Sequence, residues 1–303
     1  SMEAIEQTIN GTASASKRVT STVSRNGDLL GRMYLEVNTG TVNKANYGHA
    51  IIDNVEVEIG GQQVDKQYGH WMETHAELTE SNPSGVVAAS VADMITTGAD
   101  DGTYSTLFQK MAAAGGVSAV NVDLGNLFVP LRFWFCRNPG CYLPLIALQY
   151  HEVKLNLTLS SDYSTNSSLA LWADYVYLDT DERRRFAQVS HEYLIEQVQH
   201  QEVSDNTNFD LNFNHPVKEL VWAEVTSVGT YAALIGNCKL QLNGHDRFAA
   251  RPVAYFNKVQ PYQHHTRCPA GNVCVYSFAL KPEEHQPSGT CNFSRIDNAT
   301  LTV

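Results

Sequence analysis

Histidine and cysteine side chains gather in the last third of the chain, where their types could bind a metal ion. His264 and His265 are adjacent, and His245 and Cys268 lie nearby in the sequence. Neighbouring residues of a strand point to opposite faces, so the two histidines could chelate one ion only from a loop. The sequence contains no HxH, HExxH or HxxxH pair that would add a third ligand. We therefore predict a polar loop between strands, with no metal ligand and no cofactor.

Two carboxylate clusters have the residue types that general acid–base catalysis uses. One is Glu283-Glu284-His285, and the other contains Asp179, Asp181 and Glu182. No nucleophile or oxyanion donor stands beside either cluster, so a solvated loop and a helix N-terminus explain them better. Gly60-Gly61-Gln62 is not a phosphate loop, because no GK[ST] follows it. The sequence therefore predicts no catalytic and no cofactor-binding residue.

Three consecutive arginines, Arg183-Arg184-Arg185, could contact phosphate or lipid headgroups. The formal net charge of the chain is −11, whereas a protein that grips nucleic acid by neutralising phosphates is usually basic. Direct nucleic-acid binding is therefore not expected. In an acidic chain, salt bridges between domains or between subunits are the favoured role of these arginines.

The remaining side chains with reactive or modifiable groups carry little functional signal. Cys136 and Cys141 flank the RNPG turn, and Cys268 and Cys274 are also close in sequence, but no CxxC occurs. We interpret all six cysteines as reduced thiols, because a chain of this length is not a disulfide scaffold. N-glycosylation sequons begin at Asn10, Asn156, Asn166, Asn292 and Asn298, and ordinary secretory glycosylation is not expected.

The elements that position these residues are mainly strands. Residues 127–159 organise the chain: an aromatic segment and an alternating one, Leu155 to Leu159, flank a tight Asn-Pro-Gly turn. Pro130 is expected at a strand start or on an edge. With 43% hydrophobic and only 17% charged residues, β structure is favoured. Expected strands are 5–11, 18–24, 32–37, 51–59, 127–135, 143–149, 154–159, 171–178, 191–199, 209–213, 220–225, 239–242, 275–280 and 299–303.

Helices are expected to be short and to lie between the strands. Apolar residues near a 3.6-residue spacing predict a helix over 64–78. Short helices are also predicted at 86–94, 107–114 and 246–256. Asp179 or Thr180 is predicted to cap a further helix, with Asp181 and Glu182 in its first turn.

The order of the strands and turns occurs twice, which predicts a duplicated domain. An aromatic strand, a Pro/Gly turn and an alternating strand recur at 275–303, residues 220–225 resemble 32–37, and Asn243-Gly244 resembles Gly60-Gly61. We predict a first domain at 1–182 with a long insertion at about 82–126, a linker at 183–190 and a second domain at 191–303. The first domain is expected to lack its opening strand, and the second its final strand or strands.

Long motifs in the chain resemble the major capsid protein of the nucleocytoplasmic large DNA viruses, closest to the iridovirus and phycodnavirus members. The resemblance covers nearly the whole chain except residues 86–122, and relatives extend further at both ends. The motifs are FVPLRFWFCRNPGCYLPLIALQYHEVKLN, YLDTDERRRFAQVSHEYLIEQVQ and SFALKPEEHQPSGTCNFSRIDNATL.

The resemblance implies an all-β chain of two tandem antiparallel jelly-roll sandwiches, with short helices in the loops and linker. It further implies a homotrimer of pseudo-sixfold outline that tiles the icosahedral shell of a large double-stranded DNA virus. The expected partners are the chain itself, neighbouring capsomers, minor capsid proteins and internal viral membrane proteins. The expected location is the virion capsid, assembled in the host cytoplasm. Residues 86–122 and 249–269 are expected to face outward or to build trimer contacts.

Two other functions remain open from the residues alone. A jelly-roll lectin or host-attachment module would be favoured by exposed aromatic side chains in the loops, such as Tyr104 or Tyr255. An enzyme on a cupin-like jelly roll would need a histidine-rich metal triad at the barrel mouth, and the absence of any HxH pair disfavours it.

Overall fold

The computed structural model describes residues 1–81, 106–117, 121–164, 167–203, 207–269 and 272–303. The chain divides into two compact units. Unit 1 comprises residues 1–73 and 84–198, and unit 2 comprises residues 74–83 and 199–303. The domain and linker limits drawn from the sequence stay a prediction.

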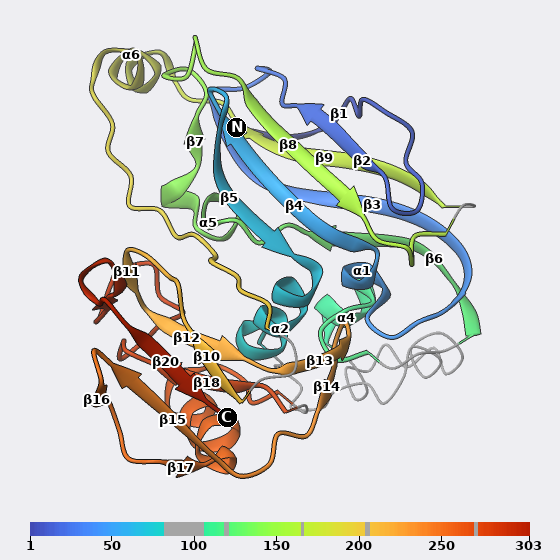
Figure 1. Ribbon diagram of the computed structural model, residues 1–303. Coiled ribbons are helices and arrows are strands. Elements are labelled where there is room, and N and C mark those ends of the chain that lie inside the picture. The colour runs from blue at the N-terminus through green and yellow to red at the C-terminus, as the bar shows by residue number, and fades with distance from the viewer. Residues whose placement is uncertain (82–105, 118–120, 165–166, 204–206, 270–271) are drawn as a thin grey trace. The chain divides into compact units, whose positions relative to one another are not determined.

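Unit 1 is a sandwich of two antiparallel sheets (Figure 1). One sheet has the strand order β1-β9-β3-β6, with the short β7 also paired to β3, and the other has the order β2-β8-β4-β5. This is the strand order of a jelly roll. The strands are β1 (Met2–Gln7), β2 (Arg18–Thr22), β3 (Leu29–Asn43), β4 (Ile52–Ile59), β5 (Gln62–Tyr68), β6 (Asn121–Pro130), β7 (Leu143–Pro144), β8 (Val153–Leu159) and β9 (Ser168–Val176).

Alternating side chains hold the two sheets of unit 1 together. In β8, Val153, Leu155, Leu157 and Leu159 face inward and are at most 3% exposed. The inner faces of both sheets and the aromatic residues before and in α5 join in one continuous apolar cluster. Burial of this cluster is the main source of the stability of unit 1.

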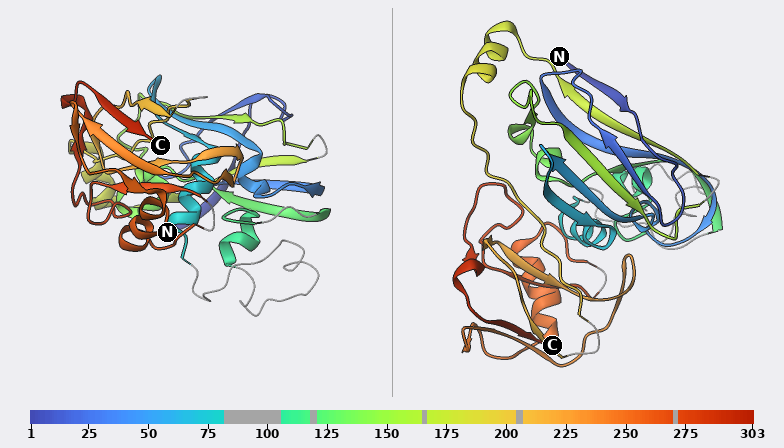
Figure 2. Two further views of the ribbon diagram at one scale, coloured as in Figure 1. Left: turned by 60° about the horizontal axis from the view of Figure 1, so that its bottom comes forward. Right: turned by 45° about the horizontal axis from the view of Figure 1, so that its top comes forward.

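The helices of unit 1 lie in the connections between strands (Figure 2). Thr106 caps α4 through a capping box with Gln109. The helices are α1 (Tyr47–Ala50), α2 (Gly69–Thr79, shared with unit 2 from Thr74), α4 (Leu107–Ala112), α5 (Trp134–Arg137), η1 (Pro139–Cys141) and α6 (Thr180–Gln188).

The described part of unit 2 has one five-stranded sheet, in which β10-β20-β15-β16 is the strand order and β17 pairs with β15, and three strand pairs, β11-β19, β12-β18 and β13-β14. Its strands are β10 (Asn208–Asp210), β11 (Pro216–Val217), β12 (Glu219–Trp222), β13 (Glu224–Ser227), β14 (Thr230–Ala232), β15 (Asn237–Leu242), β16 (His245–Asp246), β17 (Arg251–Pro252), β18 (Cys274–Ser277), β19 (Cys291–Asn292) and β20 (Ala299–Thr302). Its helices are η2 (Tyr255–Val259), α7 (Gln260–His264) and η3 (Phe293–Arg295).

The two units repeat one topology, as the sequence predicted. The order β10-β20-β15-β16 in unit 2 matches β2-β8-β4-β5 in unit 1, and the β12-β18 pair matches β3-β6. The matching hairpins β4-β5 and β15-β16 each have a two-residue turn, Gly60-Gly61 and Asn243-Gly244, in which both residues have positive φ. Such turns favour Gly and Asn, so the sequence echo has a conformational cause.

The helix predicted over 64–78 is wrong in its first half. Residues Gln62–Tyr68 form β5, and the helix begins only at Gly69. The tight Gly60-Gly61 turn pairs Gln62 directly with Ile59, so the chain after it continues as a strand. A Cβ at position 69 would lie 2.2 Å from the carbonyl oxygen of Ile52, so glycine is required where the chain changes to helix.

The strands predicted at 127–135 and 143–149 are also too long. β6 ends at Pro130, and α5 follows, so the aromatic residues Phe133, Trp134 and Phe135 fill the core from a turn of helix. β6 is an edge strand, as the proline indicated. Of the second segment, only Leu143–Pro144 pairs, with β3.

Three further expectations differ from the structure. Residues 191–199 are extended but pair with no strand, and a helical segment lies at 255–264 rather than 246–256. Unit 1 contains its opening strand β1, paired with β9. The helix predicted at 86–94 lies outside the described residues.

Candidate assembly surfaces

His265, the strongest metal-ligand candidate, is engaged by two carboxylates instead. Its side chain is 1% exposed, and Nδ1 lies 2.9 Å from Oε1 of Glu283. Nε2 lies 2.9 Å from Oε2 of Glu219, an ion pair whose alignment falls short of a hydrogen bond. Burial alone would lower the pKa of His265, but the two carboxylates outweigh it and raise the pKa to about 9. The ring is therefore an imidazolium at neutral pH.

The other residues that were considered as metal ligands do not join His265. His264 turns away, with Nδ1 3.1 Å from the carbonyl oxygen of Leu280. His245 and Cys268 are exposed, on β16 and in the loop after α7. Among the described residues, no group of three or more His, Cys, Asp or Glu side chains could hold a metal ion.

The carboxylates of 283–285 have structural partners. Glu283 accepts hydrogen bonds from the backbone nitrogen of Thr266 at 2.8 Å and from its hydroxyl at 2.5 Å. Burial would raise the pKa of Glu283, but His265 and these donors hold it below its usual range. Glu284 pairs with Lys281 at 3.0 Å on the surface. The cluster closes the loop after β18 and offers no catalytic arrangement.

The predicted helix at residue 179 is confirmed, and its first arginine has a partner within unit 1. Asp179 accepts from the backbone nitrogen of Glu182 at 2.8 Å, as an N-cap does. Nε of Arg183 donates to Oδ1 of Asp28 at 2.9 Å, and its terminal nitrogen donates to Oδ2 at 3.1 Å. The expectation of an interdomain or intersubunit salt bridge is therefore wrong for Arg183. Arg184 and Arg185 are exposed.

The sequon asparagines differ in how exposed their side chains are. Asn156 is 7% exposed and pairs with Thr20 at 3.0 Å, so it is shielded from modification. Asn10 and Asn298 are exposed, Asn292 caps η3, and Asn166 lies outside the described residues. All six cysteines are free, and burial raises the pKa of Cys136 to about 12.

In the described parts of the chain, no helix is long and apolar enough to cross a lipid bilayer.

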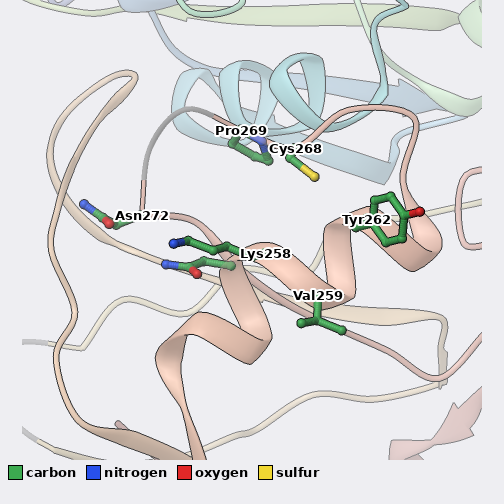
Figure 3. A pocket seen from close by; sticks show the side chains of 7 residues that line it. Lys258, Val259, Tyr262, Cys268, Pro269 and Asn272 are labelled. Carbon is green, nitrogen blue, oxygen red and sulfur yellow. The ribbon is translucent and has the colours of Figure 1, made fainter.

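The segment 249–269, predicted to face outward or to build trimer contacts, lines a shallow hollow of about 510 Å³ (Figure 3). Lys258, Val259 and Tyr262 come from η2 and α7, and Tyr262 is 82% exposed. Tyr255, offered as a lectin-type aromatic, is instead stacked under Arg251 at 4.2 Å, and its hydroxyl accepts from Gln260. Tyr104 lies outside the described residues.

Two glutamines that sequence reasoning missed cover the edge of β10. Nε2 of Gln199 donates to the carbonyl of Asn214 at 2.6 Å, and Oε1 accepts from its backbone nitrogen at 2.9 Å. Gln201 does the same with Asp210 and Asn212, at 2.7 and 3.1 Å. The spacing of two residues places both side chains on one side of an extended segment. These amides replace the neighbouring strand that an open edge would otherwise recruit.

A buried contact between a histidine and a glutamate, also missed, organises the loops of unit 1. His49 and Glu73 are both fully buried, and Nδ1 lies 2.6 Å from Oε2. Glu73 also accepts from the backbone nitrogens of Gly115 and Gly116 at 2.8–3.0 Å. Burial would raise the pKa of Glu73, but these donors lower it. The pair fixes the return of the long insertion against α1 and α2.

Two family descriptions match the chain end to end. "Major capsid protein N-terminus" covers residues 1–179, and "Large eukaryotic DNA virus major capsid protein" covers residues 182–303. The chain belongs to this family of viral major capsid proteins. The family was predicted from the motifs, and the prediction is confirmed.

Individual capsid proteins agree with the family. The major capsid protein of Pyramimonas orientalis virus is 48% identical over 100% of this chain and 83% of its own length. That of Paramecium bursaria Chlorella virus 1 is 39% identical over 100% of this chain and 78% of its own length. A quasi-atomic model of the PBCV-1 virus capsid matches with a TM-score of 0.83 and 38% identity, covering 100% of this chain and 83% of that chain.

Fold and role follow from this membership. The chain is a double jelly roll and a structural capsid protein, not an enzyme. Its role is to form the icosahedral shell, and its location is the virion capsid.

Proposed function

We propose that three copies of the chain associate into a capsomer of pseudo-sixfold outline, which tiles the icosahedral shell. One observation carries the proposal: each chain has two units of matching strand order, β2-β8-β4-β5 and β10-β20-β15-β16. Three such chains around a threefold axis present six similar lobes, and closed rings are the usual outcome of symmetric self-association. The work of such a protein is done by its buried sheet faces and its subunit interfaces, which in obligate assemblies bury some 2,000 Å² or more.

The finer partners belong to the same proposal. Minor capsid proteins and internal viral membrane proteins bind the capsomer, and assembly takes place in the host cytoplasm. The segment 249–269 projects at the end of its jelly roll, outward or into the trimer contacts, whereas most of 86–122 lies outside the described residues. The hollow beside Tyr262 supports this role for 249–269, because an 82% exposed aromatic ring is a good interface anchor.

Electron microscopy of the purified full chain tests the capsomer directly. Class averages with three-fold symmetry and six lobes are the expected result. Particles of one or two lobes at micromolar protein concentration would contradict the proposed trimer. Adding single substitutions in unit 2 loops, such as Tyr262→Ala, would then show whether the 249–269 loop holds the lobes together.

A further inference from the structure

The outer face of the β1-β9-β3-β6 sheet of unit 1 carries aromatic rings on neighbouring strands. Phe128 on β6 meets Tyr34 on β3 edge to face, with ring centroids 6.2 Å apart. Tyr34 stacks with Trp172 on β9 at 6.4 Å, with an angle of 9° between the rings. All three are half-buried. We call Phe128, Tyr34 and Trp172 the aromatic stripe.

The outer face of the opposite sheet is of a different kind. There Glu56 forms ion pairs with Arg18 at 2.9 Å and with Lys66 at 3.1 Å, and the hydroxyl of Thr20 donates a hydrogen bond to Asn156. A polar outer face is what an antiparallel sheet shows when it faces water. The aromatic stripe departs from that pattern, and aromatic residues are enriched where protein interfaces are buried.

Acidic side chains surround the stripe. Glu36 accepts from Nε1 of Trp172 at 2.7 Å. Glu6 on β1 is exposed and lies in register with Trp172. Burial raises the pKa of Asp174, which Arg32 partly offsets. The stripe therefore fits a partner that brings positive charge.

A helix with solvent-exposed arginines lies on the same unit. Helix α6 has nine residues and none of them is buried. It stands clear of both sheets of unit 1 (Figures 1 and 2). A helix of this length is marginal in water without packing. Arg183 is held by Asp28, whereas the side chain of Arg184 is 66% exposed and 4.0 Å from Asp181. Arg185 is exposed as well.

We propose that α6 of one copy of the chain docks on the aromatic stripe of a second copy, with Arg184 and Arg185 facing Glu6 and Asp174. Guanidinium groups both pair with carboxylates and stack on aromatic faces, so one helix face satisfies both features of the stripe. The contact is heterologous, because it joins different surfaces of the two copies. Contacts of this kind close into a ring when the rotation that relates the copies is a whole fraction of a turn. The proposal rests on the proposed self-association and locates one of its interfaces.

Light scattering on a dilution series of the full chain tests the contact. Trp172→Ala and the double variant Arg184→Glu/Arg185→Glu should each raise the concentration at half dissociation about 30-fold, the effect of losing an interface hot spot. The arginine variant cannot damage the core, because α6 has no buried residue. Tyr68→Ala is the matched control, since Tyr68 lies on the outer face of the opposite sheet. It should leave the dissociation unchanged.

A charge-reversal cycle adds a specific readout. Glu6→Arg introduced into the double arginine variant should recover at least about tenfold of the lost association, because the opposite charges meet again. The proposal is overturned if Trp172→Ala and the double variant dissociate at the wild-type concentration. It is equally overturned if Trp172→Ala destabilises the monomer but leaves association unchanged, which would mean that the chain covers its own stripe. A wild-type chain that is monomeric at every concentration contradicts the trimer itself.

Discussion

The two units share a strand order but differ in how they are held together. Unit 1 has a five-stranded and a four-stranded sheet around one continuous apolar cluster. In the described residues of unit 2, there is one five-stranded sheet and three two-stranded pairs, and the buried residues form separate smaller clusters. Counterparts of β1 and β9 are not among the described strands of unit 2. The same topology is therefore stabilised by one continuous core between two sheets in unit 1, and by several smaller apolar clusters in unit 2.

Unit 2 compensates with aromatic and ionic contacts. A chain of ring contacts, with centroids 4.8–6.3 Å apart, connects the β12-β18 pair to η2, to η3 and to the segments that follow β10 and β16. Its members are Trp222, Phe256, Phe248, Tyr276, Phe278, Phe293 and Phe213. His265 ties α7 to β12 and to the loop after β18. The stability of unit 2 should therefore be sensitive to alkali, and that of unit 1 to loss of apolar volume and to acid.

The largest effect should come from the core of unit 1. Leu35 on β3 is fully buried in the continuous cluster. Leu35→Ala should lower the free energy of unfolding of unit 1 by about 4 kcal/mol, from lost transfer energy and an unfilled cavity. Hydrogen exchange with peptide resolution in denaturant measures it for each unit. Leu301→Ala in unit 2 is the matched variant and should cost about 2 kcal/mol; an equal cost would break the comparison.

The buried contact between His49 and Glu73 in unit 1 should come next. Glu73→Gln leaves His49 without its carboxylate and should cost about 3 kcal/mol at pH 7. The folded-state pKa of Glu73 is lowered, so its contribution is full above its ordinary pKa and is lost as the pH falls. The difference in the free energy of unfolding between wild type and Glu73→Gln should therefore become smaller in acid. A gap that widens below pH 4 would show that the pair is not ionised in the folded state.

His265 should make unit 2 sensitive to alkali. Its folded-state pKa of about 9 lies above the ordinary value of 6.5, so its contribution is full below 6.5 and is lost as the pH rises through 9. The free energy of unfolding of the wild type should exceed that of His265→Gln by about 2 kcal/mol at pH 6.5. At pH 10 the two free energies of unfolding should be nearly equal. Denaturant unfolding followed across this range checks the prediction. A gap independent of pH would mean that His265 acts only by packing.

The smallest effect should come from the glutamines that cover β10. Gln199→Ala and Gln201→Ala should each cost about 1 kcal/mol, the net value of the hydrogen bonds they make. They should also speed amide exchange at Asn212 and Asn214, which donate to these side chains. Gln63→Ala, at an exposed position of β5, is the control and should change neither. Unaltered amide exchange in all three variants would show that the two glutamine side chains do not stabilise this part of unit 2.

Much of the fold could be predicted where local patterns and tertiary packing agree. The alternation of 154–159, the Asp179 cap and the paired turns Gly60-Gly61 and Asn243-Gly244 all led to correct elements. Turn chemistry is local, so it survives in the sequence. The duplication was visible for the same reason.

The misses have tertiary causes. Residues 191–199 read as a strand, yet a strand forms only when a neighbour pairs with it, and sequence alternation does not supply one. The helical spacing of 64–78 was overridden by the hairpin that forms β5. His265, His49 and Glu73 could not be connected in advance, because their partners are 18 to 46 residues away or lie on other elements. The aromatic stripe was hidden because its members come from three distant strands.

The solution mass of the purified full chain, measured by light scattering after size exclusion, tests the central claim of self-association most directly. A mass near three times 33.5 kDa is the predicted result, and it should fall to one chain on sufficient dilution. A folded species of 33.5 kDa at every concentration, micromolar and above, would contradict the proposed capsomer while leaving the family membership intact.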